Sequence, residues 1–244
     1  MERQRADLLL VERGLFESRA KARAAIEAGR VFVAGAAVSR PSQTYPCDAD
    51  IQAEPAHPWV GRGGLKLDHA LSLWPVPVAG RVVLDLGAST GGFTQVCLAR
   101  GAAKVFAVDV GRGQLHPSLA QDPRVVSLEG LDARALTPDV IPAAPELIVC
   151  DASFISLTKV APAALDLAAP AADLVALVKP QFEVGPQNIG KGGAVRDPAL
   201  IEQAVTGAVD WLAQRAWPVR ETAPSPVRGG DGAVEHLVWA RKAG

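Results

Sequence analysis

Ionisable side chains stand at or near the ends of several apolar runs in this sequence. Asp85, Asp109 and Asp151 each follow a run of Val, Leu, Ile and Ala residues, and Lys179 follows a fourth run. Near-continuous apolar runs are typical of strands covered on both faces of a parallel sheet, and the carboxyl ends of such strands meet at one edge. A carboxylate there can bind hydroxyl groups, and a lysine can exchange a proton. The pattern therefore predicts that these polar side chains converge at a ligand-binding edge of a sheet.

A glycine-rich turn follows the first of these acids. Residues 85–93 read DLGASTGGF, between a predicted strand and a predicted helix. Such a turn lets a ligand approach the backbone closely, although its spacing is not the GxGxxG of dinucleotide sites and a lone turn is a weak signal. Asp109 strengthens it, because a carboxylate about twenty residues after the turn can accept hydrogen bonds from both hydroxyls of a ribose. Together the two features indicate a nucleoside cofactor.

From about residue 61 onward, apolar runs alternate with helical patterns. This alternation predicts an α/β fold with a mostly parallel sheet and helices on both faces. The expected strands span residues 80–87, 104–109, 124–128, 146–151, 173–180 and, last, 234–240.

The first 54 residues have a different character, rich in Arg, Ala and Glu. Ser18 is a good N-cap and Gly29 a good C-cap for a helix between them. The expected elements are helices at residues 5–12 and 19–28, a strand at residues 31–33, and a further strand segment that begins at Val38.

Two prolines, Pro55 and Pro58, separate these patterns and predict a stiff connector. We therefore expect a small α+β domain at residues 1–54, a linker at residues 55–60 and an α/β domain at residues 61–244.

Basic residues cluster at the start of the second predicted helix and just past its end. They include Arg19, Lys21, Arg23 and Arg30, and glutamates are interspersed with them. A solvated helix face is the plain interpretation. The alternative is a set of phosphate contacts, which would position RNA without reading its sequence.

Composition limits the class of function. The formal net charge is −1 over 244 residues, and proteins that neutralise phosphates usually carry a basic excess, so any contact with RNA must come from local patches. The first residues are too charged for a secretory signal. Prolines and aspartates interrupt the most apolar stretch, residues 160–178, which argues against a membrane span. We expect a cytoplasmic protein.

Three cysteines, Cys47, Cys97 and Cys150, lie far apart and form no CxxC pair. Neither a disulfide framework nor a zinc site is expected. Cys97 and Cys150 lie in apolar segments, where cysteine usually serves as a small core residue.

The order of features in the first domain resembles the S4 domain, a small RNA-binding module. A departure is Ala34, where asparagine is common before the glycine of the turn. The resemblance implies that the second helix and the loop after it face folded RNA. The residues expected to contact RNA are Arg5, Arg19, Lys21, Arg23 and Arg30, together with Arg62 at the start of the second domain.

The second domain resembles the FtsJ-like methyltransferases that use S-adenosylmethionine (SAM), and the whole chain is similar to the TlyA-type (hemolysin A) family of ribosomal RNA 2′-O-methyltransferases. The most specific motifs are GGLKL at residues 63–67, DVGRGQL at 109–115, DASFIS at 151–156, VKPQFE at 178–183 and GKGGAVRDP at 190–198. The resemblance implies a Rossmann-like domain with a mostly parallel seven-stranded sheet.

The same resemblance implies SAM as the cofactor, no metal, and ribosomal RNA within ribosomal subunits as the partner. The methylated nucleotide would be a cytidine of 16S rRNA, 23S rRNA or both. No obligatory protein partner is expected. By this likeness Asp109 is the ribose ligand and Asp132 lies at the adenine. The full set of implied cofactor-binding residues is Asp85, Gly87, Ser89, Gly91, Gly92, Phe93, Asp109, Asp132 and Asp151.

A catalytic tetrad of Lys66, Asp151, Lys179 and Glu235 is also implied by the resemblance. A ribose hydroxyl is a poor nucleophile because its proton is held tightly. A lysine beside it can take or share that proton when burial or another cation destabilises the ammonium form. We expect Lys179 to do so, oriented by Asp151, while Lys66 and Glu235 position the hydroxyl.

The surroundings of Glu235 depart from the family pattern. Ala233 stands where an asparagine is usual, and His236 stands where an aromatic residue is usual. We expect these differences to bear on substrate fit rather than on SAM binding, with His236 as a solvent-facing strand residue or a substitute nucleotide contact.

Three other classes of function remain open at this point. The family's second name suggests a membrane-active hemolysin, which the sequence disfavours because it has no strongly basic amphipathic helix. An RNA-binding protein with an inactive methyltransferase fold is disfavoured by the intact tetrad. A small-molecule methyltransferase would fit the near-neutral charge but not the S4-like domain.

Overall fold

The computed structural model describes residues 3–190, 192–229 and 232–243. Lys191, within the motif at residues 190–198, lies outside the described residues. The chain divides into two compact units, Met1–Pro58 and Trp59–Gly244. Each unit has its own hydrophobic core.

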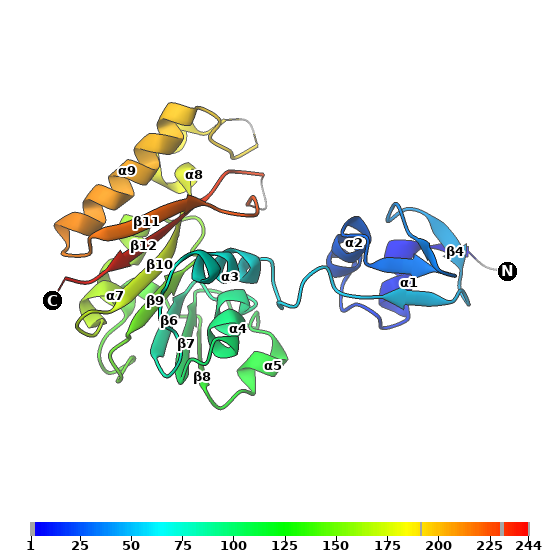
Figure 1. The fold of residues 1–244 in the computed structure, drawn as a ribbon, viewed down its shortest axis with the longest axis horizontal. Helices are drawn as coiled ribbons and strands as arrows, with labels where there is room; N and C mark the ends of the chain where they lie inside the picture. The colour runs from blue at the N-terminus through cyan, green and yellow to red at the C-terminus, as the bar shows by residue number, and fades with distance from the viewer. Residues whose placement is uncertain (1–2, 191, 230–231, 244) are drawn as a thin grey trace. The chain divides into compact units, whose positions relative to one another are not determined.

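The N-terminal unit is a small α+β domain. β1 pairs antiparallel with β4, and β2 lies between β3 and β5 in a second antiparallel sheet. Side chains of both helices and of β2 form the core, including Leu10, Ala22, Ile26 and Val31. The elements are β1 (Arg3–Arg5), α1 (Ala6–Glu12), α2 (Arg19–Glu27), β2 (Val31–Val33), β3 (Ala36–Ala37), β4 (Thr44–Pro46) and β5 (Ile51–Ala53) (Figure 1).

The predicted caps of the second helix in this unit are confirmed. The Ser18 hydroxyl accepts the N–H of Lys21 at 3.3 Å and caps α2, and Gly29 follows that helix with φ +68°. The prediction that Val38 begins a strand is wrong. The strand covers Ala36–Ala37. Val38 still donates its N–H to the Val31 carbonyl at 2.9 Å, but the paired register with β2 ends at Ala37 and the valine side chain is buried in the core.

A buried carboxylate fixes two arginines on this unit. Asp7 is fully buried and accepts hydrogen bonds from Arg5 Nε and Arg19 Nη2, each at 2.9 Å. The hydrogen bond from Arg5 lowers the pKa of Asp7 to about 2. The carboxylate thus joins the end of β1 to the first residue of α2.

The C-terminal unit is built on a sheet with the strand order β11-β12-β10-β9-β6-β7-β8 in the described residues. β8, β7, β6, β9 and β10 are parallel, whereas β12 runs antiparallel to both β10 and β11. The strands are β6 (Val82–Leu86), β7 (Lys104–Asp109), β8 (Val125–Glu129), β9 (Leu147–Cys150), β10 (Asp173–Val178), β11 (Val219–Pro224) and β12 (His236–Arg241).

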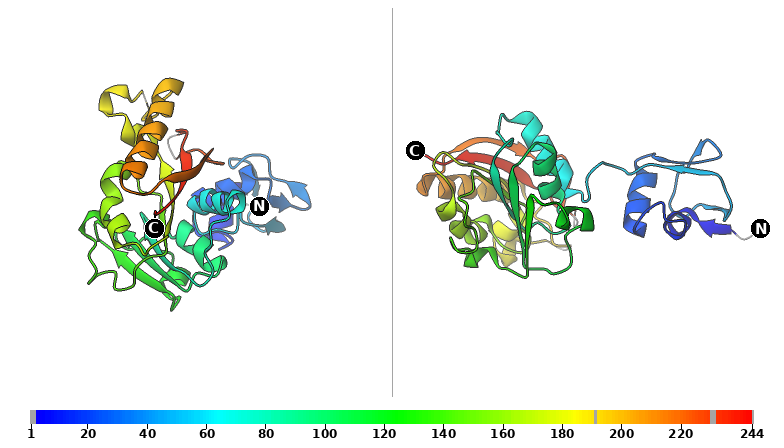
Figure 2. Two further views of the ribbon diagram at one scale, coloured as in Figure 1. Left: turned by 60° about the vertical axis from the view of Figure 1, so that its left-hand side comes forward. Right: turned by 90° about the horizontal axis from the view of Figure 1, so that it is seen from below.

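Helices cover both faces of this sheet, as Figures 1 and 2 show. α3 and α4 pack on one face through Leu67, Phe93 and Val96, and α6, α7 and α9 pack on the other through Val160, Leu165 and Leu212. The helices are α3 (Gly63–Leu73), α4 (Gly92–Ala99), α5 (Pro117–Ala120), α6 (Leu157–Val160), α7 (Pro162–Leu167), α8 (Pro180–Glu183) and α9 (Pro198–Gln214), with 3-10 turns at Ala133–Ala135 and Pro186–Asn188.

The predicted fold class is confirmed: a mostly parallel seven-stranded sheet with helices on both faces, preceded by a small α+β domain. Cys97 and Cys150 are buried in the core, as expected. The last strand differs from the prediction, since it begins at His236 and Glu235 precedes it. Within the described residues, no helix has the length and apolar character needed to cross a membrane.

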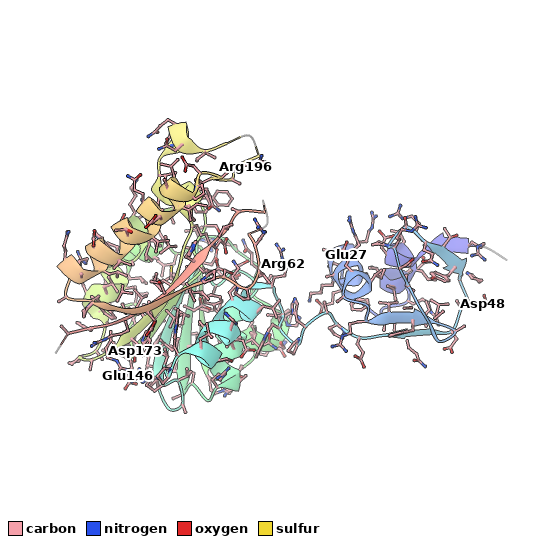
Figure 3. All side chains as sticks on the ribbon, turned by 45° about the horizontal axis from the view of Figure 1, so that its top comes forward. Glu27, Asp48, Arg62, Glu146, Asp173 and Arg196 are labelled. Atoms are coloured by element: carbon pink, nitrogen blue, oxygen red, sulfur yellow. The ribbon has the colours of Figure 1, made fainter. Side chains whose placement is uncertain are left out.

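The amino ends of β9 and β10 are held by a different set of charges from those at the carboxyl ends. Asp173, at the start of β10, accepts hydrogen bonds from Arg81, Trp239 and Arg241. Figure 3 shows Asp173 beside Glu146, which precedes β9, and both lie far from Arg62. This network anchors β12 beside β10 at the end of the sheet opposite the strand-end acids.

Asp85 ties β6 to α4. Its side chain is completely buried, and Oδ2 accepts the hydroxyl of Thr94 at 2.7 Å, whereas Oδ1 is buried without a hydrogen-bond partner among the described residues. Burial raises the pKa of Asp85 to about 7, and the nearby charges of Asp151 and Asp109 add to this effect. Asp85 is therefore an acid whose neutral form the fold favours.

The Asp85→Asn substitution tests that buried acid. An unfolded aspartate has a pKa of about 3.9, so the raised folded pKa contributes stability at low pH that is lost as the pH rises from about 4 to about 7. The free energy of unfolding of the asparagine variant should therefore rise relative to wild type over that interval, on the order of 1.4 kcal/mol per pKa unit. Urea denaturation between pH 4.5 and 8 measures the difference.

Asp210→Asn is the control, because Asp210 lies exposed on α9. Its difference from wild type should not depend on pH in this way. A stability difference between Asp85→Asn and wild type that stays constant across the range would contradict the assignment.

Candidate active site

The four residues of the expected tetrad come from four separate elements and meet at the carboxyl edge of the sheet. Lys66 lies in α3, Asp151 follows β9, Lys179 follows β10, and Glu235 precedes β12. The pairing of Val178 with His236 places Lys179 beside Glu235, and the parallel pairing of Ala176 with Cys150 brings the ends of β9 and β10 together. The sheet register therefore assembles residues that are up to 169 positions apart.

Asp151 is the centre of this arrangement. Its Oδ1 lies 2.7 Å from Lys179 Nζ, and its Oδ2 lies 3.3 Å from Lys66 Nζ. Both lysines and Glu235 are buried, whereas the Asp151 side chain is partly exposed. Buried charges are tolerated when they are paired in this way. The cluster holds two cations and two carboxylates, so it is neutral overall.

Glu235 completes the cluster through Lys66. Oε2 of Glu235 lies 2.6 Å from Lys66 Nζ, and this oxygen is buried without a hydrogen-bond partner among the described residues. The contact between Glu235 and Lys66 is therefore an ion pair. Its backbone carbonyl accepts the N–H of Ser225, which fixes its position beside the last strand.

Lys179 has three oxygens around its amine. Besides Asp151 Oδ1, Nζ donates to the Ser153 hydroxyl at 2.8 Å and to the Asp151 carbonyl at 3.1 Å. An ammonium has three N–H donors, so these contacts match its capacity. A hydroxyl that approaches this nitrogen would have to replace one of them, and Ser153 is the neutral side-chain partner.

Two cavities share this edge of the sheet. Cavity A, of about 290 Å³, holds the tetrad and is lined also by Arg62, Phe93 and Arg228. Cavity B, of about 640 Å³, is lined by Asp109, Gln114 and Asp132 among others. Residues that line both cavities are Gly87, Ser89, Asp151 and Ser153. A group passing from one cavity to the other would therefore pass beside Asp151.

The glycine-rich turn lines both cavities at this shared boundary through Gly87 and Ser89. Gly87 has φ +78°, and a Cβ there would lie 2.8 Å from the backbone Cα of Ala152, so a larger residue would push two strand ends apart. Ser89 also has a positive φ, and its N–H donates to Asp109 Oδ2 at 2.8 Å. The turn after β6 and the acid after β7 are thus locked together.

The remaining predicted cofactor residues fall into different positions. Gly92 and Phe93 line cavity A, and Asp132 lines cavity B, where it pairs with Arg134. Gly91 packs close to Leu115 and Leu119, which a Cβ would strike. Asp85 is buried beneath the turn and, within the described lining, reaches neither cavity.

Glu129, at the end of β8, was not anticipated from the sequence. It accepts the backbone N–H groups of Gly113, Gln114 and Leu115, and these hydrogen bonds lower its pKa. The segment after β7 is therefore held against β8. The position of Glu129 at the end of an apolar run was the sequence signal that could have identified it.

Phe154 was included in a motif by the sequence analysis but was not selected as a site residue. Its side chain is 92% exposed, and its φ of +65° is rare for a bulky residue. Its ring lies 5.5 Å from that of Phe182, centroid to centroid. It lines both cavity B and a neighbouring cavity of about 660 Å³, cavity C, which also contains Arg134 and Glu183. Strain and exposure together are typical of functional positions.

Two arginines stand at cavity A. Arg62 is exposed at the start of α3, where Figure 3 labels it. Arg228, which the sequence analysis did not select, is exposed on the segment between β11 and β12 and donates to the Gly232 carbonyl at 3.1 Å. Both are well placed to bind an anion at the rim.

The basic residues of the N-terminal unit are largely paired with acids. Arg5 and Arg19 share Asp7, and the others pair one to one: Lys21 with Glu17, Arg23 with Glu27, and Arg30 with Glu54. Arg3 and Arg13, which the sequence analysis did not select as RNA contacts, donate to backbone carbonyls. Positive charge in excess therefore lies at these two arginines and where Arg5 and Arg19 share one carboxylate.

Comparison with known proteins agrees with this geometry. The FtsJ-like methyltransferase family matches residues 59–242, and the S4 domain family matches residues 4–46. The chain is 46% identical over 243 residues to the 16S/23S rRNA (cytidine-2'-O)-methyltransferase TlyA of Mycobacterium tuberculosis, covering 98% of this chain and 90% of the relative. It is 41% identical over 244 residues to the putative rRNA methyltransferase YqxC of Bacillus subtilis, covering 98% and 86%.

A solved structure described as a putative hemolysin from Streptococcus thermophilus superposes with a TM-score of 0.77 at 36% identity, covering 100% of this chain and 90% of that one. The chain therefore belongs to the family of FtsJ-like methyltransferases that carry an S4 domain, the family that includes TlyA.

Proposed function

We propose that this protein transfers a methyl group from SAM to the 2′-hydroxyl of a cytidine in ribosomal RNA. The observation that carries the proposal is the position of Asp151, which lies on the wall shared by cavities A and B while it contacts both lysines of the tetrad. The names of the relatives supply the nucleotide and the class of RNA.

Cavity B fits SAM by its lining. Asp109 offers carboxylate oxygens whose other contacts are the backbone N–H groups of Ser89 and Gly111, and such a carboxylate suits a ribose diol. Gly87 and Gly111 line cavity B, where the absence of side chains exposes the backbone to a ligand. SAM would supply a methyl group on a positively charged sulfur, which an oxygen nucleophile attacks in line. Asp151, on the shared wall, is placed to stabilise a cation there.

Cavity A fits the acceptor hydroxyl. A hydroxyl that replaces Ser153 at Lys179 Nζ lies beside both the amine and Asp151. Lys179 would first release its ammonium proton to solvent when the acceptor hydroxyl displaces Ser153; it would then accept the hydroxyl proton as the new carbon–oxygen bond forms, and Asp151 would hold the regenerated ammonium. Lys66, held by Glu235 and Asp151, fixes the carboxylate that orients Lys179. In-line positioning of the two reactants supplies much of the remaining acceleration.

RNA would be held by local charge, because the chain has a formal net charge of −1. Arg62 and Arg228 at cavity A suit phosphates next to the methylated nucleotide. The Arg5–Asp7–Arg19 cluster of the S4 domain suits another phosphate of the RNA. We further propose that residues 55–60 form a linker between an S4 domain at residues 1–54 and the methyltransferase domain at residues 61–244.

The Lys179→Ala substitution tests the mechanism. Positioned proton transfer contributes typically 10²–10⁴-fold to rate, so methyl transfer from labelled SAM to isolated ribosomal subunits should fall by roughly 100-fold or more. Affinity for SAM should stay within a few-fold of wild type, because Lys179 lines cavity A and not the described part of cavity B. Resistance of the modified site to alkaline cleavage identifies the 2′-O position.

Lys104→Ala serves as the matched control, since Lys104 begins β7 at the opposite end of the sheet. It should retain full activity. Undiminished transfer by Lys179→Ala would sink the mechanism. Ribonuclease-insensitive transfer of label to small molecules, with no label in either ribosomal subunit, would instead indicate a small-molecule methyltransferase. Lysis of red cells by the pure protein would support the hemolysin hypothesis.

The exposed ring of Phe154 lines both cavity B and cavity C, and we propose that it stacks on a base of the RNA beside the methylated nucleotide. Base–aromatic stacking contributes about 1–3 kcal/mol per base, so Phe154→Ala should raise KM for the RNA about tenfold, while Phe154→Tyr should leave it near wild type. Phe154→Gly should show the same loss of activity and be more stable than Phe154→Ala by up to about 1 kcal/mol, because glycine relieves the positive φ that alanine keeps. An unchanged KM in Phe154→Ala would show that the exposed ring does not meet RNA.

A further inference from the structure

One face of the β3-β2-β5 sheet in the N-terminal unit carries an exposed aromatic side chain. Val31 is buried and Val33 half-buried on the core side, so Phe32, between them, faces the opposite way. The Phe32 side chain is 37% exposed. Strand register places Ala37 on one side of it and Gln52 on the other. The sheet therefore presents a ring flanked by a methyl group and an amide.

This ring lies in a cavity of about 400 Å³, cavity D. The cavity is lined by Ala28, Gly29, Arg30, Phe32, Gln52, Ala53 and Glu54. Gly29 has φ +68°, and no atom lies within 4 Å of the position of a Cβ there. Small residues thus leave the space above the ring open, and the larger side chains around it are polar.

The charges in cavity D cancel. Arg30 Nη1 lies 3.3 Å from Glu54 Oε2, so one guanidinium and one carboxylate face each other at the cavity. A phosphate needs uncompensated positive charge, which this pair does not offer. A flat neutral ring with hydrogen-bonding edges fits cavity D well. Phe32 offers a stacking face, Gln52 offers a donor and an acceptor, and Glu54 offers acceptors.

We propose that cavity D binds a single unpaired nucleobase of the RNA, stacked on Phe32. Protein side chains recognise unpaired RNA bases in this way, by stacking on aromatic rings and by hydrogen bonds to base edges. Glu54 favours a base with an exocyclic amino group, because a carboxylate accepts from such groups, so uracil is the poorest occupant. The proposal rests on the proposed function for the presence of RNA, and it assigns Arg30 to a base pocket rather than to a phosphate.

The test uses the full chain and its ribosomal subunit substrate. Phe32→Ala and Phe32→Ile both remove the stacking ring, and isoleucine keeps the strand preference and much of the apolar surface. Each should weaken binding about tenfold, and Phe32→Tyr should restore it. The slope of log Kd against log salt should stay at the wild-type value, because no phosphate contact is lost. Arg19→Ala should reduce that slope.

Leu15→Ala is the matched control, because Leu15 is an exposed apolar residue of the same unit at 42% exposure, outside the described lining of cavity D. It should bind as wild type does. A second readout is ultraviolet cross-linking of wild type to the RNA followed by mass spectrometry, which should map a base to the peptide that contains Phe32. Binding to short oligonucleotides should favour cytosine-rich over uracil-rich RNA and lose that preference in Glu54→Gln.

Wild-type affinity in both Phe32→Ala and Phe32→Ile, with no cross-link at Phe32, would overturn the base pocket while methylation of the subunit by wild type keeps the proposed function intact. A reduced salt slope in the Phe32 variants would overturn it as well, because it would show a lost phosphate contact. Failure of wild type to bind or methylate any ribosomal subunit would instead overturn the proposed function, and the pocket with it.

Discussion

The Asp151 carboxylate, shared between two buried lysines, is the interaction on which the candidate site depends. Its two oxygens contact Lys179 and Lys66, and Lys66 in turn contacts Glu235. Removing Asp151 would leave Lys179 without its carboxylate, and removing Lys66 would leave Glu235 without its cation; a buried charge that loses its partner is costly in a protein interior. The four side chains therefore hold one another in a single arrangement, and that arrangement lies where the two cavities meet.

The register of the sheet brings those charged side chains together. The parallel strands bring Asp85, Asp109, Asp151 and Lys179 toward one edge, and the antiparallel β12 returns Glu235 to the same edge. At the other end, Asp173 binds Arg81, Trp239 and Arg241 and fixes the alignment of β12 against β10. A slip of β12 by one residue would turn Glu235 away from Lys66. The Asp173 network thus stabilises the alignment of β12 that keeps Glu235 beside Lys66.

Charge is arranged locally rather than globally in this protein. Most basic residues of the S4 domain are matched by a carboxylate, which accounts for the near-neutral chain. Excess positive charge remains at Arg5 and Arg19, which share Asp7, and at the two arginines of cavity A. Such an arrangement limits nonspecific attraction to nucleic acid and leaves specificity to shape, stacking and hydrogen bonds.

The sequence by itself determined the elements whose signals are local. Apolar runs predicted the five parallel strands to within a few residues, Ser18 marked the start of α2, and the family resemblance implied the four residues that the structure brings together. Other features depended on partners that lie far along the chain. The positions of Val38 and Glu235 relative to their strands, the pairing of arginines with glutamates, and the exposure of Phe154 and Phe32 belong to this group. Local propensity fixes which residues form a strand, but only packing and register decide which side chain is buried, which charge meets which, and which ring is left facing solvent.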